Sequence, residues 1–479
     1  MHYNLLISAT KPDTFIDKGF QMIDSLILWC RPHNMYIILD LHAAPGGQGH
    51  DQPISDYDPS KPSLWESEEN QALTAILWKE IARRYVHEPI IGGYDILNEP
   101  NWELGSSNQV LRSFYQRITD SIRQVDTSHI IFIEGNWFAT DFNGLTPPWD
   151  NNMVYSFHKY WSAYNTSSIQ YLLNIRDSYN VPLWLGETGE NSNHWFTQIV
   201  NLMNQHKIGW ACWPYKKTGS VAGPLTITKP AGYQVLLNYW NGQAPKPTAG
   251  YAFNALMELT DSLRIEHCTF HPDVIHAWMT FPGQTQTIPF RYITVPGKIF
   301  CADYDMGYQN TSYYDTDYQN TAGAGKASWN SGGAYRNDGV DIERCTDNIT
   351  NGYNVGWINN GEWLTYTIQV TQSNYYAFNI RYASQSATGK MHIEIDENNN
   401  TTITHYYELD TSFFFINSRK PCLECIETSN HDVVLFGKKI FLMDEDEIIR
   451  LMKSNGYPNF EKEEEVWGES RITFEDAMI

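Results

Sequence analysis

The first half of the chain alternates between stretches of helical periodicity and short apolar runs. Apolar residues at three- and four-residue spacing predict amphipathic helices, and compact apolar runs bounded by breaker residues predict buried strands. The predicted helices span 16–30, 71–84, 110–125, 169–179, 195–206 and 234–240. The predicted strands span 35–41, 91–98, 130–134, 153–157, 182–186 and 209–213. Strands that alternate with helices in this way are typical of parallel βα units.

The six predicted strands fall two short of a closed (β/α)8 barrel, which has eight. A strand before the first predicted helix would end near residues 1–3, so nearly all of it would precede this sequence. A barrel that is open on one side leaves unpaired strand edges and an exposed core. We therefore expect an α/β fold, a (β/α)8 TIM barrel that is incomplete at its N-terminus, and a sequence that starts inside a longer gene.

Two of the predicted strands lead directly into a glutamate that is followed at once by breaker residues. Glu99 follows the run 91–98 and precedes a proline, and Glu187 follows the run 182–186 and precedes Thr-Gly. In a closed parallel barrel the carboxyl ends of all strands lie on one face, where the chemistry occurs. Glu99 and Glu187 are therefore predicted to share a pocket although they lie 88 positions apart. Two carboxylates that face each other across a cleft are what a glycosidase requires.

Five short motifs stand at the predicted strand ends. They are Asp-Leu-His-Ala-Ala-Pro-Gly-Gly at 40–47, Leu-Asn-Glu-Pro at 97–100, His-Lys-Tyr-Trp at 158–161, Gly-Glu-Thr-Gly at 186–189 and Trp-Pro-Tyr at 213–215. Together, and in this order, they resemble glycoside hydrolase family 5, and the resemblance extends over residues 1–242. It implies a (β/α)8 barrel of the retaining β-glycanases, which use no cofactor or metal for catalysis.

The resemblance implies a role for each matching position. Glu99 would be the general acid/base, which needs a raised pKa, and Glu187 would be the ionised nucleophile, about 5 Å away in a retaining enzyme. The substrate-binding positions that it implies are His42, Asn98, Trp137, His158, Tyr160 and Trp213. Asn98 would contact the sugar 2-hydroxyl, and Tyr160 would hold Glu187 through its phenol. Trp213 would lie under the sugar at the cleavage site.

Several of these residues also fit a structural interpretation. His42 and His158 are compatible with hydrogen-bonded core histidines, and Trp137 is compatible with ordinary packing. Glu134 and Glu190 are further acids near strand ends, and we expect a surface or structural pairing for both. The family carries an arginine beside the nucleophile on an earlier strand, and no residue of this sequence corresponds to it.

The pattern changes after residue 242. Residues 243–297 begin with the linker-like Gln-Ala-Pro-Lys-Pro and continue into a predicted helix at 251–263, to which we assign no function. From 298 to 405, alternating Tyr, Thr and Val with frequent Gly and Asn predict an all-β domain. The stretches Gly-Ala-Tyr-Arg-Asn-Asp-Gly at 333–339 and Trp-Ile-Asn-Asn-Gly-Glu-Trp at 357–363 resemble a family 6 carbohydrate-binding module.

That family is a jelly-roll β-sandwich that holds sugar between loop aromatics and usually carries a structural calcium. The resemblance implies that Tyr335 and Trp357 bind carbohydrate, and strand alternation favours a core position for Trp363. The family's closing strands and a ligand-contacting asparagine have no counterpart in this chain, so we expect an incomplete sandwich. Residues 406–479 form a tail of unknown nature, either a small appended element or the product of a frameshift or gene join.

The composition narrows the class of partner. The 33 basic and 55 acidic residues give a formal charge of −22, which argues against nucleic acid and anionic membranes, and no apolar run reaches the length of a membrane span. The 17 Trp and 30 Tyr suit the flat faces of sugars. The seven cysteines include one Cys-x-x-Cys, at 422–425, without a second pair, so we predict free thiols or one adventitious disulfide and no metal site there. The first residues do not form a secretion signal, but polymeric glycans do not enter cells, so we expect a secreted or extracellular protein.

The leading hypothesis is a retaining β-glycoside hydrolase of the endo-β-1,4-glucanase or cellulase type, with a β-glucan or related plant or microbial polysaccharide as its substrate. Another β-linkage, in β-1,3-glucan, xyloglucan or mannan, is the second hypothesis, because the loops that select the substrate are the least readable part. A non-catalytic glycan-binding protein on a decayed barrel is the alternative from a different class.

Overall fold

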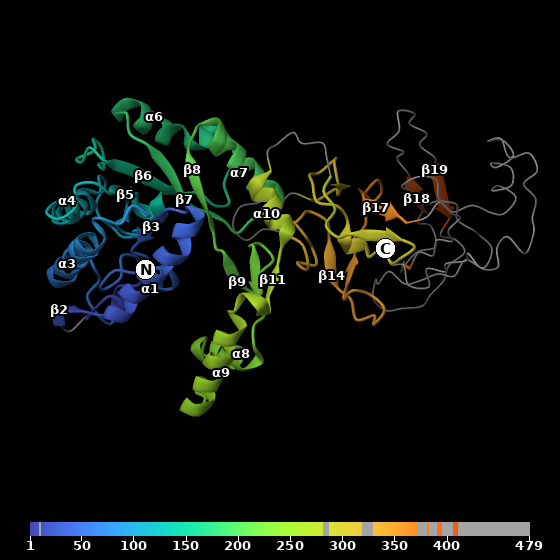
Figure 1. Cartoon of the computed structure of the whole chain (residues 1–479), viewed down its shortest axis with the longest axis horizontal. Coiled ribbons are helices and arrows are strands. Elements are labelled where there is room, and N and C mark those ends of the chain that lie inside the picture. Colours follow the sequence, from blue (N-terminus) through green and yellow to red (C-terminus); the bar gives the residue numbers. More distant parts are fainter. Residues whose placement is uncertain are drawn as a thin grey trace, which may run out of the picture. The chain divides into compact units, whose positions relative to one another are not determined.

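A computed structural model describes residues 1–8, 11–280, 287–318, 329–371, 381–382, 390–394 and 406–410 (Figure 1). The chain forms two compact units. The first unit comprises Met1–Gly189 and Ile199–Trp213, and the second comprises Glu190–Gln198 and the chain from Pro214 onward. The predicted domain boundaries after residues 242, 297 and 405 stay predictions. Residues 411–479, which include most of the predicted tail and the Cys-x-x-Cys, lie outside the described part of the chain.

A curled six-stranded parallel sheet forms the centre of the first unit. Its strands follow one another in chain order: β3 (Ile37–Asp40), β4 (Ile91–Asp95), β5 (Ile130–Glu134), β6 (Met153–His158), β7 (Leu183–Gly189) and β8 (Gly209–Trp213). All five neighbouring pairs are parallel. The α/β class and the six strands of an incomplete TIM barrel are therefore confirmed.

Helices connect these strands and cover the outside of the sheet (Figure 1). They are α1 (Asp17–Cys30), α2 (Gln52–Ser55), α3 (Glu68–Tyr85), α4 (Gln109–Arg123), α5 (Asn136–Ala139), α6 (Gln170–Tyr179) and α7 (Asn193–Gln205). Helix α3 shows why they form where they do. The Ser67 side chain accepts a hydrogen bond from the Asn70 N–H at the helix start, and acidic residues occupy its first turn and arginines its last.

The residues before α1 lie beside the carboxyl end of β3. His2 forms a parallel bridge with Ala43, and the Tyr3 N–H donates to the Ala43 carbonyl oxygen at 3.0 Å. The His42 N–H in turn donates to the Met1 carbonyl oxygen at 2.8 Å. Residues 1–3 thus lie where the sequence predicts the end of a preceding strand. A short hairpin, β1 (Ile7–Ser8) and β2 (Lys11–Phe15), follows them.

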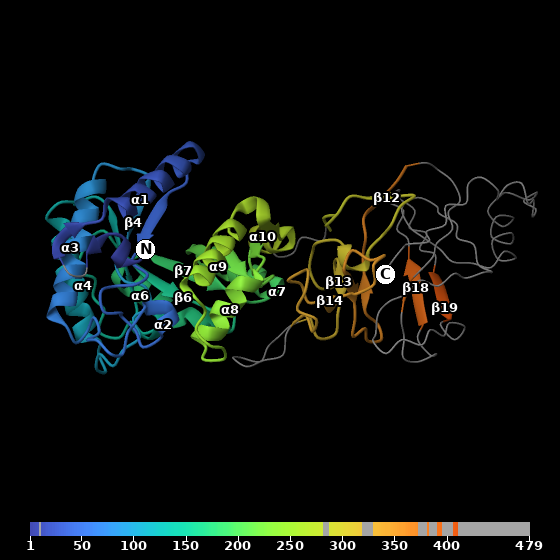
Figure 2. The same cartoon turned by 90° about the horizontal axis from the view of Figure 1, so that it is seen from below.

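The second unit begins with mixed elements and continues with paired strands. Its helices are α8 (Ala231–Trp240), α9 (Ala249–Ser262) and α10 (Pro272–Met279), and α8 lies beside α9 (Figure 2). A three-stranded sheet consists of β9 (Lys216–Thr218), β10 (Leu225–Ile227) and β11 (Cys268–Phe270). Helix α9 agrees with the prediction, whereas β11 and α10 were not predicted because their apolar runs are too short to show a period.

The carboxyl-terminal part of the second unit is a β region, as predicted. Its strands are β12 (Ile293–Val295), β13 (Tyr313–Tyr314), β14 (Ile342–Arg344), β15 (Tyr353–Val355), β16 (Trp363–Leu364), β17 (Ile368–Val370), β18 (Lys390–Glu394) and β19 (Tyr406–Asp410). Its core includes Tyr304, Tyr313 and Ile342. The core position predicted for Trp363 is wrong, because this side chain is 40 % exposed and the next residue, Leu364, packs against the core instead.

Five single turns of 3-10 helix complete the described elements: Tyr3–Leu5, Arg31–His33, Thr166–Ile169, Ile265–His267 and Cys301–Asp303. No helix in the described ranges combines the length and the apolar character needed to cross a bilayer. The five cysteines of these ranges, at 30, 212, 268, 301 and 345, are free thiols.

Candidate active site

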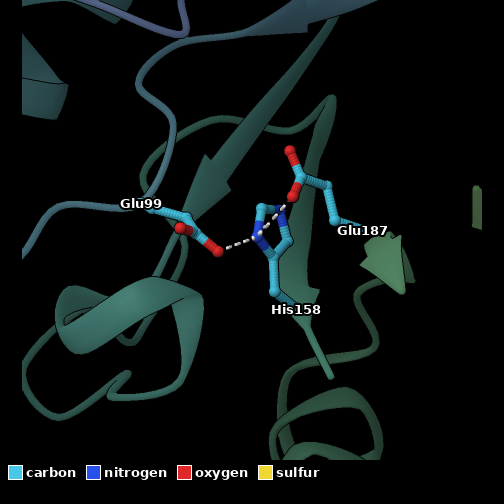
Figure 3. Close-up of side chains that lie close together, drawn as sticks. All are labelled: Glu99, His158 and Glu187. Atoms are coloured by element: carbon cyan, nitrogen blue, oxygen red, sulfur yellow. Dashed lines mark hydrogen bonds and ion pairs between the residues drawn. The ribbon is translucent and has the colours of Figure 1, made fainter. Parts of the chain in front are cut away.

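Glu99 and Glu187 meet at the carboxyl end of the parallel sheet. Glu99 follows β4, and Glu187 lies near the end of β7. One carboxylate oxygen of each residue and a ring nitrogen of His158 all lie within 4.8 Å of one another (Figure 3). Glu99 is buried and has a φ of 43°, a backbone conformation that is costly for a residue with a Cβ and is concentrated at functional sites. The two glutamates therefore share one pocket.

The imidazole of His158, the last residue of β6, lies between the two glutamates (Figure 3). Its Nδ1 is 2.6 Å from the Glu99 Oε1 and 3.6 Å from the Glu187 Oε2. Its Nε2 is 3.2 Å from the Glu134 Oε1. The ring is thus in contact with three carboxylates, and its side chain is only 2 % exposed.

Tyr160 contacts this cluster, and Asn98 immediately precedes Glu99. The Tyr160 hydroxyl donates to the Glu187 Oε2 at 2.9 Å, which fixes that carboxylate. Asn98 is buried, and its backbone carbonyl oxygen accepts a hydrogen bond from the Gln48 side chain at 2.8 Å. Among the residues that the structure describes, none accepts from the Asn98 Nδ2. A buried donor without a partner is costly, so this amide is available to a ligand hydroxyl.

His42 and Trp213 form the side of the cluster next to β3 and β8. Their rings stack with centroids 5.3 Å apart and an interplanar angle of 12°. The His42 Nδ1 lies 3.3 Å from the Asp40 Oδ2, while the Trp213 side chain stays 39 % exposed. A half-exposed indole held in place by a stacked ring can contact the apolar face of a sugar.

Trp137 lies on an exposed turn directly after β5. Its φ and ψ are 54° and 62°, and the next two residues also have positive φ. The indole is 41 % exposed, in contrast to the buried Glu99 and His158. The structure therefore puts Trp137 at the surface and outside the hydrogen-bonded cluster of Glu99, His158 and Glu187.

Burial and neighbouring charges shift the acidity of the cluster. Burial is the main reason that the pKa of Glu187 is raised to about 7, and Glu99 and Glu134 add to the rise while His158 opposes it. Burial opposes protonation of His158, but the surrounding carboxylates outweigh it and hold the pKa of that ring well above its usual value. These carboxylates therefore favour the protonated form of His158 beside Glu187.

A second carboxylate group lies next to His158 and was missed by the sequence reasoning. Asp40, Asp95 and Glu134 each offer an oxygen within 4.8 Å of the others. Burial is the main cause that raises the pKa of Asp95 well above its ordinary value, and it also raises the pKa of Glu134. Glu134 has a structural pairing, as expected, but it is inside the site and not at the surface. Its signal was visible, because it ends a predicted strand just as Glu187 does.

The groups with metal-binding geometry belong to both units. In the first unit they are Glu99, His158 and Glu187 and, beside them, Asp40, Asp95 and Glu134. The carboxyl groups of Glu99 and Glu187 already make hydrogen bonds, with His158 and Tyr160 respectively. In the second unit Asp315, Asp317 and Glu362 offer oxygens within 4.8 Å of one another. Burial, followed by the nearby Asp317 and Glu362, raises the pKa of Asp315 to about 8. An all-oxygen set of crowded carboxylates suits a calcium ion.

The two predicted carbohydrate-binding aromatics of the β region differ in exposure. Tyr335 is half-buried, stacks on Tyr353 with centroids 4.3 Å apart and donates to Asp303. Trp357 is 51 % exposed. Both have a positive φ, 65° for Tyr335 and 50° for Trp357, which is unusual for bulky side chains. Trp357 is the more exposed of the two rings, and one face of Tyr335 is covered by Tyr353. The sugar-binding role of both residues stays a prediction.

The parallel sheet with acidic residues at its carboxyl end defines the TIM-barrel class of protein. Residues 3–219 match the cellulase family, which is glycosyl hydrolase family 5. Residues 334–411 match the carbohydrate-binding module family 6. One region of the chain thus matches glycosyl hydrolase family 5 and another matches carbohydrate-binding module family 6, which are the two families that the sequence motifs indicated.

Several characterised proteins are similar to parts of this chain. A β-xylosidase of Phanerodontia chrysosporium is 28 % identical over 263 residues, which cover 47 % of this chain and 54 % of that protein. A protein named probable glucan 1,3-beta-glucosidase A, of Aspergillus fumigatus, is 28 % identical over 29 % of this chain and 33 % of its own length. Endoglucanase C of Acetivibrio thermocellus is 22 % identical, and the match covers 45 % of this chain and 78 % of that protein. This chain spans about half the length of the first of these relatives and a third of the second.

Solved structures are also similar to part of this chain. The crystal structure of endoglucanase Cel5A from the hyperthermophile Thermotoga maritima has a TM-score of 0.39 and an identity of 18 %, and the match covers 47 % of this chain and 78 % of that one.

Proposed function

We propose that this chain is a retaining β-glycoside hydrolase that cleaves β-glucan by double displacement. The observation that carries the proposal is the approach of one Glu99 oxygen to one Glu187 oxygen within 4.8 Å at the carboxyl end of a parallel sheet. A retaining enzyme has its two carboxyl groups about 5–5.5 Å apart, whereas an inverting enzyme needs about 6.5–9.5 Å to accommodate a water.

In the first step the Glu187 carboxylate attacks the anomeric carbon while the Glu99 carboxylic acid protonates the leaving oxygen. The glycosidic bond breaks, and a covalent glycosyl ester on Glu187 forms. In the second step Glu99, now a carboxylate, takes a proton from water, and the resulting hydroxide equivalent displaces Glu187 from the sugar. The Asn98 amide donates to the sugar 2-hydroxyl, which stabilises the transition state, and Tyr160 holds the Glu187 carboxylate in line.

The linkage that we propose first is β-1,4, in an endoglucanase of the cellulase type. The cellulase-family match and the similarity to an endoglucanase support this choice. β-1,3-Glucan is the second candidate, favoured by the 28 % identity to a protein named as a glucan 1,3-β-glucosidase. Xyloglucan and mannan remain further β-linked candidates, and a non-catalytic glycan-binding protein is the alternative if hydrolysis is absent.

We further propose that the β region binds polysaccharide through Trp357 and holds a structural calcium at Asp315, Asp317 and Glu362. The family 6 match supports the first role, and the crowded oxygens support the second. A protein that acts on polymeric glycans works outside the cell, so we also propose a secreted or extracellular location.

The test is hydrolysis of a panel of soluble polysaccharides by the purified full chain. Release of reducing ends from a β-1,4-glucan, with the β-anomer as the first product in proton NMR, is the expected result. Preferential release from β-1,3-glucan would select the second linkage. An α-anomer as first product would exclude double displacement, and no hydrolysis of any β-glycan would favour the non-catalytic alternative.

A further inference from the structure

The reaction proposed above uses Glu99 and Glu187, but a third buried glutamate contacts the same machinery. Glu134, the last residue of β5, is 1 % exposed. Its Oε2 accepts a hydrogen bond from the Glu99 N–H at 2.6 Å, and its Oε1 lies 3.2 Å from the His158 Nε2. One carboxylate thus contacts both the backbone of the proposed acid/base and the ring that joins it to the nucleophile.

We propose that Glu134 is a positioning residue that keeps His158 protonated on both ring nitrogens, so that its Nδ1–H always faces the two catalytic carboxylates. This inference rests on the proposed function, because it names what controls the charge beside the nucleophile. Glu134 does not touch the reacting atoms and acts only through Glu99 and His158.

The hydrogen-bond pattern favours two protons on the ring. A neutral imidazole has one N–H and one lone pair, so it can donate to only one carboxyl group. Here Nδ1 faces Glu99 at 2.6 Å and Nε2 faces Glu134 at 3.2 Å. A carboxylate oxygen and the carbonyl oxygen of a carboxylic acid both accept from a ring N–H, so the imidazolium satisfies both contacts also when Glu99 carries the proton of a general acid. A doubly donating ring also fixes its own orientation between β4 and β5.

The surrounding charges favour the same assignment. Facing Glu134 and His158 are Asp40 at the end of β3, Asp95 at the end of β4, Glu99 and Glu187. Burial holds the pKa of Asp95 well above its ordinary value, which weakens this carboxyl as a partner of the His158 charge. Glu134 is the acid whose oxygen lies 3.2 Å from Nε2, whereas Nδ1 faces Glu99 and Glu187.

The imidazolium also affects the proposed nucleophile. His158 lowers the pKa of Glu187, against burial and the neighbouring carboxylates that raise it to about 7. Without Glu134, the His158 ring loses the carboxylate that faces Nε2, and Nε2 then loses its proton. Loss of the Glu134 charge by itself lowers the pKa of Glu187, but His158 has the larger influence on that pKa, so that Glu187 needs a higher pH to ionise once the imidazolium charge is lost.

Glu134→Gln removes the negative charge of the side chain and keeps its size and shape. The Glu99 N–H needs an acceptor, so the amide oxygen of the new side chain faces it and the amide NH₂ faces His158. Only an unprotonated Nε2 can accept from this NH₂, which leaves a neutral ring with its proton on Nδ1. We expect the acidic limb of kcat/KM to move to higher pH by about one unit, with KM little changed.

The control variant is Glu190→Gln, another glutamate next to the end of a strand. Glu190 pairs with Lys217 and contacts none of the three catalytic-site residues. This variant should leave the pH profile unchanged. A folded Glu134→Gln enzyme with a wild-type acidic limb would overturn the positioning role.

A measurement on the wild-type protein does not depend on the folding of any variant. Nitrogen-15 NMR of the histidine rings reports how many ring nitrogens carry a proton, and we expect both nitrogens of His158 to be protonated throughout pH 6–8. A neutral His158 in this range would refute the inference. An inactive wild-type enzyme with a doubly protonated His158 would instead refute the proposed function and leave the pairing with Glu134 intact.

Discussion

At the residue scale, Glu187 is the side chain whose charge decides the proposed reaction. Glu187→Gln keeps the size and the Tyr160 hydrogen bond but removes the nucleophile. We expect kcat on soluble β-glucan to fall by a factor on the order of 10⁴ or more, with binding retained. The matched control is Glu103→Gln, an exposed glutamate paired with His50, which should retain wild-type activity. Near-normal hydrolysis by Glu187→Gln would exclude this residue as the nucleophile.

The pH dependence follows from the same carboxyl. Glu187 must be ionised to attack, and burial raises its pKa to about 7. Activity should therefore fall as the pH drops below about 7 and rise as the pH passes through this value. The measurement is kcat/KM of the free enzyme between pH 5 and 9, at constant ionic strength. An acidic limb near the ordinary pKa of a glutamate, about 4.3, would contradict this assignment.

The proposed role of Glu99 as the acid can be tested by comparing substrates with poor and good leaving groups. The proposed acid protonates the leaving oxygen, so it matters most where that oxygen is a poor leaving group. Glu99→Ala should slow hydrolysis of the polysaccharide by about 10²–10⁴-fold and slow an activated aryl β-glycoside much less at the glycosylation step. Added azide should accelerate turnover of the aryl substrate and give a β-glycosyl azide. Equal losses on both substrates would argue against the acid role.

At the element scale, the close packing of β6 against β7 positions the site. A Cβ built on Gly186 in β7 would lie 2.5 Å from the Ser156 Oγ and 3.1 Å from the His158 Nε2. Both neighbours are buried, so the added methyl clashes with the Ser156 hydroxyl and crowds the His158 ring. The absence of a side chain at Gly186 thus leaves room for the His158 ring beside Glu134.

Gly186→Ala should therefore reduce both stability and activity. We expect about 1–3 kcal/mol of destabilisation, measured by thermal or denaturant unfolding, and a loss of kcat that exceeds the change in KM. Gly250→Ala in α9 is the control, because nothing lies within 4 Å of its Cβ and alanine suits a helix. A Gly186→Ala protein as stable and active as wild type would show that His158 can move without cost.

At the scale of the whole molecule, the two family regions should respond differently to loss of metal. The proposed catalysis uses carboxylates and no metal, so a chelator should leave hydrolysis of a soluble β-glucan unchanged. The same treatment should lower the melting temperature of the β region, since three crowded carboxylates would then repel one another. Calorimetry with and without added calcium measures this effect. Loss of hydrolysis on chelation would point to a metal at Glu99, His158 and Glu187.

Retention on polysaccharide and hydrolysis of soluble substrate should also depend on different parts of the chain. Trp357→Ala removes a half-exposed indole of the β region, for which we propose sugar binding, so retention on an insoluble polysaccharide should fall by about tenfold, while hydrolysis of soluble substrate should stay unchanged. Trp240→Ala is a matched control with an equally exposed indole on α8. Unaltered retention by the Trp357 variant would place the sugar site elsewhere.

Much of the first unit could be predicted because its elements have long, periodic patterns. Helices α3 and α4 and all six parallel strands lie within a few residues of the predicted ranges. Strand β7 continues to Gly189, beyond the predicted end, because Thr188 and Gly189 pair with β8. Strand pairing of this kind depends on a neighbour, and local periodicity does not record it. In the β region the strands are too short to show a periodic pattern, and the core position predicted for Trp363 was wrong.

The sequence by itself determined which residues end the strands, and hence that Glu99 and Glu187 belong to one face of a parallel sheet. Local apolar runs and breaker residues are enough for this, since the topology of a parallel sheet brings all carboxyl ends to the same edge. Only the tertiary structure decided that Glu134 faces inward, that His158 lies between three carboxylates, and that the pKa of Glu187 is raised. Those properties arise from burial and from distances between residues remote in the chain, and neither quantity is encoded in a local pattern.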